Sequence, residues 1–191
     1  MKDEVIKLEN IQAELLKFEN DIYRHHKCLN REVAFSAMII KKTNDILEAS
    51  KHALKNYLIT IQISLLRLMC DNCLAIEAAI VLGLEKYINM LNNNEHVSNI
   101  MIDEEQNMSD GYLKKLVAKN YKGFDKLYNF ACESVHFSKQ ALGSTFIDND
   151  GKISINVKPG NKEMKDEMIQ NNKQLITLCK VILDMLKRIC L

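Results

Sequence analysis

The chain has 191 residues, with 26 lysines and arginines against 25 aspartates and glutamates, so its formal net charge is +1. This balance excludes a protein that coats nucleic acid through overall positive charge, although it is compatible with a local basic patch. One proline, six glycines and 47% hydrophobic residues favour long helices around one core, and we expect a single domain over residues 1–191.

The sequence also predicts a cytoplasmic protein without bound metal or cofactor. The first residues are charged, unlike the apolar core of a signal peptide, and no apolar run of about 18 residues occurs, so we expect no membrane span. The six cysteines are scattered through helical segments, which is typical of reduced, buried thiols. Cys70 and Cys73 form an isolated C-x-x-C pair, interpreted as packing residues, and no glycine-rich phosphate loop is present.

Apolar residues recur at helical spacing through most of the chain, and this periodicity predicts an all-α bundle of five or six helices. The first expected helix covers residues 2–29, with an inner face formed by Leu8, Ile11, Leu15, Phe18, Ile22 and Leu29. The second covers residues 31–56. The third covers residues 57–91 and is the most apolar, so we expect it to lie at the centre of the bundle.

This central helix has one narrow polar stripe, formed by Thr60, Ser64, Arg67 and Asp71. Arg67 and Asp71 are four residues apart and can form an ion pair. The stripe is either a thin solvent-facing strip or a buried polar site that needs a partner from another helix. His136 is the candidate partner, so Arg67, Asp71 and His136 are the candidate catalytic residues.

Residues 92–110 are polar and weakly periodic, which predicts a surface loop. The helix expected after this loop places four lysines along one face, namely Lys115, Lys119, Lys122 and Lys126. A lysine stripe is usually a solvated face, and the functional alternative is that it binds phosphate groups. For that alternative the four lysines are candidate binding residues.

Residues 126–142 combine a core-facing helical pattern with polar residues, namely Tyr128, Asn129, Cys132, Glu133, His136 and Ser138. Tyr128, Asn129 and Ser138 are further candidate binding residues. Glu133 and His136 match half of a di-iron site, but no second E-x-x-H pair occurs, so a metal is not expected. Cys132 lies one turn before His136, yet a core-facing thiol on a helix has no oxyanion site, which favours packing over nucleophilic catalysis.

The C-terminal part begins with a predicted β-hairpin near residues 144–157. Ile153, Ile155 and Val157 alternate with polar residues there, after the tight-turn pair Asp150 and Gly151. A last helix is expected over residues 161–190, with a seam formed by Met168, Leu175, Cys179, Ile182, Leu186 and Ile189.

The segment Y-N-F-A-C-E-S-V-H-F-S, residues 128–138, resembles part of the HEPN-like helical proteins, in particular uncharacterised prokaryotic members with an aromatic residue followed by V-H-x-S. The stretch LLRLMCDNCLAIEAAI is similar to their long central helix, and the resemblance covers roughly residues 55–142. It implies an all-α bundle of a kind that is commonly dimeric and occurs in RNA-cleaving toxins and phage-defence systems. RNA and a second copy of the chain are therefore the implied partners.

The HEPN ribonuclease motif places an arginine before the histidine with four to six residues between them, and this arginine is missing here. The corresponding positions before His136 hold Asn129, Phe130 and Ala131. Without a cation beside the scissile phosphate, the charge of the transition state lacks its main stabiliser, so we expect weak or no cleavage. Arg67 is the cation that another helix could supply.

Two functional hypotheses follow from these observations. In the first, the chain is a HEPN-like protein that binds or acts on RNA in a bacterial defence or toxin–antitoxin context. In the second, it is a non-catalytic helical module for protein interaction, in which Arg67, Asp71, Tyr128 and His136 form a structural polar network.

Overall fold

The computed structural model describes residues 1–102, 106–135, 146–149, 152–155 and 162–191. These residues form seven α-helices, which are α1 (Lys2–His26), α2 (Arg31–Asn56), α3 (Ile59–Leu82), α4 (Leu84–Asn92), α5 (Asp110–Asn120), α6 (Phe124–Val135) and α8 (Lys162–Cys190). A 3₁₀ turn, Val97–Asn99, lies between α4 and α5. The all-α class predicted from periodicity is confirmed.

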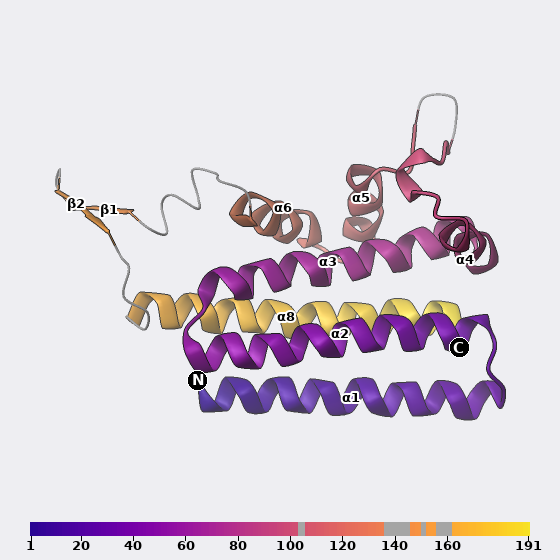
Figure 1. Ribbon diagram of the computed structural model, residues 1–191, viewed down its shortest axis with the longest axis horizontal. Coiled ribbons are helices and arrows are strands. Elements are labelled where there is room, and N and C mark those ends of the chain that lie inside the picture. Colours follow the sequence, from indigo (N-terminus) through magenta and orange to yellow (C-terminus); the bar gives the residue numbers. More distant parts are fainter. Residues whose placement is uncertain (103–105, 136–145, 150–151, 156–161) are drawn as a thin grey trace.

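Four long helices, α1, α2, α3 and α8, lie side by side, and α5 and α6 form a further layer on α3 (Figure 1). α3 contacts α2 and α8 in the bundle and α4, α5 and α6 outside it, which makes it the central helix. Buried apolar residues such as Leu66, Met69 and Ile76 lie on several of its sides. Covering an apolar helix from two directions removes most of its surface from water, and this burial is the main favourable term in folding.

The connection between α1 and α2 begins earlier than the periodicity indicates. Lys27 has a left-handed φ of 56° and ends α1, while the Asn30 side chain caps α2 by accepting a hydrogen bond of 2.9 Å from the Val33 backbone N–H. Leu29 therefore lies in the connection and is 77% exposed, so its predicted place on the inner face is wrong. The other five predicted inner-face residues of this helix are buried.

The expected third helix is divided at Gly83, and this division accounts for a seventh helix in place of five or six. Gly83 has φ 80° and ψ 137°, a backbone conformation that is essentially restricted to glycine. The chain therefore leaves α3 and starts α4 in a new direction. Helical periodicity alone continues through this glycine, which explains why the sequence pattern predicts one helix.

Two short strands, β1 (Phe146–Asn149) and β2 (Lys152–Ile155), pair in antiparallel register with Phe146 opposite Ile155 and Asn149 opposite Lys152. They lie within the span where the sequence predicts a hairpin. Within the described part of the chain, none of the helices combines the length and the apolar composition needed to cross a bilayer.

The division at Gly83 gives a test of the fold. We expect Gly83→Ala to lower the free energy of unfolding by about 1–3 kcal/mol, because a Cβ disfavours this backbone conformation. Gly111→Ala is the matched control, since Gly111 lies in α5 and an added Cβ would meet the Ser109 Oγ only at 3.8 Å. The control should be neutral or slightly stabilising. Urea unfolding of both variants measures the difference, and equal effects would contradict the assignment.

Candidate polar site between α3, α5 and α6

Within the polar stripe of α3, Arg67 faces the layer formed by α5 and α6. The Arg67 side chain is 20% exposed and forms an ion pair with Asp71 one turn further along α3. Arg67 is thus mostly buried, with one carboxylate partner on its own helix. A guanidinium in such a position needs further hydrogen-bond acceptors, because it has five N–H donors in a fixed geometry.

Two of these acceptors come from the neighbouring helices. Arg67 Nη2 donates to the Tyr128 hydroxyl on α6 at 2.7 Å and lies 3.3 Å from the Asp110 carboxylate at the start of α5. The Tyr128 hydroxyl donates in turn to the same Asp110 oxygen at 2.9 Å. Arg67, Tyr128 and Asp110 therefore form a closed triangle that joins three helices. We call these three residues, together with Asp71, the α3 polar network.

Aromatic contacts reinforce this network. The Arg67 guanidinium carbon lies 4.2 Å from the centroid of the Tyr128 ring, and Lys114 Nζ lies 5.4 Å from the same centroid. Both distances suit attraction between a cation and the negative face of an aromatic ring. Lys114 also donates a 2.8 Å hydrogen bond to Asn129 Oδ1, which ties α5 to α6 a second time.

Titration of the site follows from burial. Burial of the Tyr128 phenol, and then its hydrogen bond to Asp110, raise its pKa, while the nearby Arg67 opposes this rise. Burial likewise raises the pKa of Cys70 to about 12 and that of Cys73 well above its usual value. Both thiols therefore stay protonated near neutral pH, and a thiol must lose its proton to act as a nucleophile or metal ligand. Cys70 and Cys73 are buried packing residues of α3.

The four candidate lysines lie outside the polar network. Lys115 and Lys119 lie on α5, Lys122 in the following turn and Lys126 on α6, and all four are exposed. The prediction that one helix carries them along one face is wrong, because α5 ends at Asn120 and α6 begins only at Phe124. None of the four lysines forms a hydrogen bond or ion pair with any residue that the structure describes. We call these four residues the basic face. Their charges are available to a partner from outside the chain.

The structure brings only some of the predicted site residues together. Arg67, Asp71 and Tyr128 share one network, while Asn129 is exposed and binds Lys114. His136 and Ser138 lie outside the described residues, so the predicted approach of His136 to Arg67 stays a prediction. Val135 follows Tyr128 and Ala131 at helical spacing, which predicts a core position, but it is 47% exposed at the end of α6, so this prediction is wrong.

Sequence reasoning missed Asp110 and Lys114 as members of the site. Asp110 follows the capping residue Ser109, and an acidic residue in the first turn of a helix is typical of an interaction with the helix dipole alone. The packing of α5 across α3 turns its carboxylate to Arg67 instead. No local sequence pattern predicts a contact between residues that are 43 positions apart.

No protein-family model, no curated protein and no solved structure matches this chain. The contacts of the site are therefore the basis for assigning its role. With its charge already balanced by two carboxylates, Arg67 is suited to holding α5 and α6 on α3 rather than to binding a free phosphate.

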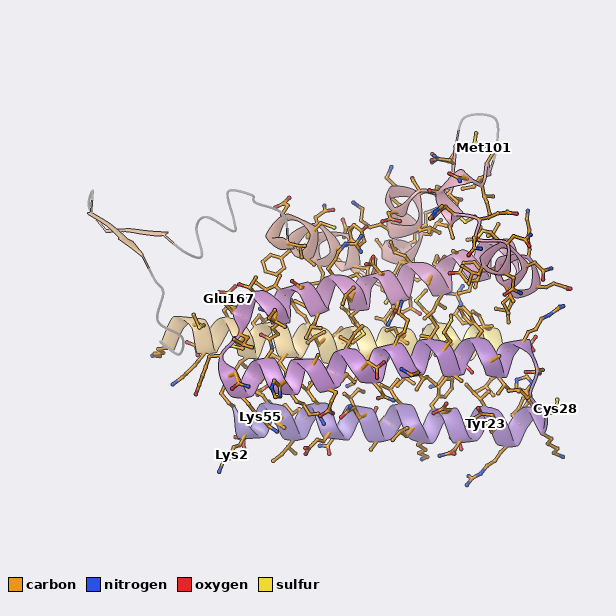
Figure 2. All side chains as sticks on the ribbon, in the orientation of Figure 1. Lys2, Tyr23, Cys28, Lys55, Met101 and Glu167 are labelled. Carbon is orange, nitrogen blue, oxygen red and sulfur yellow. The ribbon has the colours of Figure 1, made fainter. Side chains whose placement is uncertain are left out.

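This assignment predicts a loss of stability in Tyr128→Phe. The change removes one hydroxyl that both accepts from Arg67 and donates to Asp110, and we expect the free energy of unfolding to fall by about 1–2 kcal/mol. Tyr23→Phe is the control, because Tyr23 lies on α1 (Figure 2) and is exposed, and its effect should stay within about 0.5 kcal/mol. Chemical denaturation compares the two, and a Tyr128→Phe variant as stable as the control would refute the network.

Proposed function

We propose that this chain is a HEPN-like helical domain that binds RNA through the phosphate backbone and cleaves it weakly or not at all. The observation that supports the proposal is the basic face, in which four exposed lysines have no acidic partner among the described residues. Elsewhere an exposed lysine can be paired with an acid on its own helix, as Lys41 is with Asp45 on α2.

The charge of the basic face is local. Residues 110–126 contain five lysines and two aspartates, while the whole chain has a net charge of only +1. One of these aspartates, Asp110, is already engaged by Arg67 and Tyr128. Binding of phosphates at the four lysines would release condensed counterions from RNA, which is the main source of affinity for a backbone-binding protein.

The α3 polar network supports the second half of the proposal. Cleavage of RNA needs a cation that stabilises the negative charge of the transition state. Arg67 is the only arginine on α3, and its guanidinium is occupied by Asp71, Asp110 and Tyr128. A cation whose charge is neutralised in the folded state gives little of this stabilisation.

RNA binding is tested by reversing two charges of the basic face, in the variant Lys115→Glu/Lys126→Glu. We expect wild-type binding to single-stranded RNA to weaken steeply with salt, and the variant to bind more weakly with a slope reduced by about 1.4, since each contact contributes about 0.7. Fluorescence anisotropy between low and physiological salt measures both quantities. The two positions are exposed, so the fold should be retained.

The control is Lys2→Glu/Lys17→Glu on α1, which makes the same change in net charge at two exposed positions. Lys2 lies at the outer edge of α1, on the side of the bundle away from α5 and α6 (Figure 2). This variant should bind like the wild type. Equal losses in both variants would show a response to net charge only, and a wild type without salt-dependent binding would exclude the proposal.

Cleavage is tested separately, with purified protein and mixed RNA beside a His136→Ala variant. We expect little degradation by either protein, because loss of a comparable electrostatic group typically lowers rates by about 10²–10³. Robust cleavage that disappears in His136→Ala would contradict this expectation. It would assign the missing cation to another residue, most directly Arg67.

A second candidate function is a protein-interaction module without nucleic-acid binding. The closed contacts among Arg67, Tyr128 and Asp110 favour it, because such a network rigidifies a helical surface without any chemistry. In that case the basic face is a solvated surface and RNA binding is absent at all salt concentrations. The homodimer implied by the HEPN resemblance belongs to either proposal and stays a prediction.

A further inference from the structure

The turn between α5 and α6 connects the basic face to a helix from the other end of the chain. Tyr121 lies in this turn, and its hydroxyl donates a 2.5 Å hydrogen bond to the Asp184 carboxylate on α8. Burial of the phenol, followed by this hydrogen bond, raises the pKa of Tyr121 to about 12, so the hydroxyl keeps its proton at neutral pH. The basic face and the surface of α8 are thus adjacent at this bond.

Positively charged residues lie close to both partners of the bond along the chain. Lys119 and Lys122 flank Tyr121 in sequence, and Lys180 and Arg188 lie one helical turn before and after Asp184. Lys187 is seven residues after Lys180 and shares its side of α8. These five cations are all exposed. We call the three of them on α8, Lys180, Lys187 and Arg188, the α8 cations.

Few carboxylates oppose this charge. Asp184 lies in the middle of it and is engaged by Tyr121. Glu77 of α3 also lies near Arg188. Burial raises the pKa of the Glu77 carboxyl, Arg188 opposes this rise, and the residue is only 5% exposed. The Tyr121 hydroxyl also lies close enough to Arg188 for the guanidinium to oppose the rise in its pKa. Within residues 115–122 and 180–188, which carry these cations, Asp184 is the only acid.

The arrangement suits a chain of phosphates. Lys180 and Arg188 are eight residues apart, which corresponds to about 12 Å along a helix, so the α8 cations extend the surface as a row and not as a pocket for one phosphate. On α5, the turn and α8, the described residues with large exposed apolar side chains are limited to Leu191, which leaves no apolar wedge for a lipid bilayer. Exposed aromatic side chains for base stacking are also lacking on these elements, so contacts would be to the backbone.

We infer that the RNA-binding surface continues from the basic face across Tyr121 onto α8, where Lys180, Lys187 and Arg188 contact further phosphates without regard to base sequence. This inference rests on the proposed function. It adds a site from a helix that lies outside the HEPN-like stretch of the chain.

The first test is Lys180→Gln/Lys187→Gln, which removes two charges and keeps most of both side chains. We expect weaker binding to single-stranded RNA and a salt slope reduced by about 1.4 relative to wild type, because about 0.7 is lost with each contact. Lys2→Gln/Lys17→Gln on α1 is the matched control and should bind normally. Circular dichroism and thermal unfolding establish that all variants are folded. Poly(U) and poly(A) of equal length should bind with similar affinity.

The second test removes the central acid and predicts a gain. Asp184→Asn keeps an oxygen that can accept from Tyr121 but removes the negative charge, so RNA should bind about two- to five-fold more tightly. Asp21→Asn on α1 is the control and should leave affinity unchanged. A purely structural Asp184 would give no gain, and unchanged or weaker binding of a folded Asp184→Asn protein would count against the inference.

The outcomes separate the inference from the proposed function. If Lys115→Glu/Lys126→Glu loses binding while Lys180→Gln/Lys187→Gln binds like wild type, the surface ends at α6 and the inference is wrong, although RNA binding stands. If wild type does not bind RNA, both fail. Binding to vesicles with anionic lipid, with no binding to RNA, would assign the same cations to a membrane surface and would also overturn the inference.

Discussion

Because α3 carries apolar side chains on nearly every side, it has to be covered by other helices from two directions. α2 and α8 cover it within the bundle, and α5 and α6 cover it from outside (Figure 1). This requirement sets the positions of the other elements. It also removes part of the water around the charged side chains of Arg67 and Asp71, which therefore need partners within the protein.

The α3 polar network supplies these partners. Arg67 Nη2 binds Asp110 on α5 and Tyr128 on α6, so these contacts also join the outer layer to α3. The lysines of the basic face are exposed on this outer layer and its turn. The structure thus separates two uses of positive charge. The arginine is internal and balanced, while the lysines are external and unpaired within the described residues.

Much of this architecture is predictable from sequence, because periodicity reports which side of a helix is buried. Leu8, Ile11 and Leu15 are buried as the pattern requires. In the polar stripe of α3, Arg67 and Asp71 form the ion pair that their spacing predicts. Backbone conformation at single residues is less visible. The left-handed Lys27 and the positive φ of Gly83 end helices that the apolar pattern alone would continue. Contacts such as Arg67 with Asp110 and Tyr121 with Asp184 depend on how helices cross, which no local spacing encodes.

The central claim is that the α3 polar network, in addition to apolar packing, holds α5 and α6 on the four-helix bundle. Hydrogen–deuterium exchange of wild type and Arg67→Met tests it most directly, because methionine keeps the apolar stem and removes the charge that Asp110 and Tyr128 bind. The account predicts faster exchange of the amides of α5 and α6, while those of α1, α2 and α8 keep their protection. Unchanged exchange throughout, or an equal loss of protection in all helices, would contradict it.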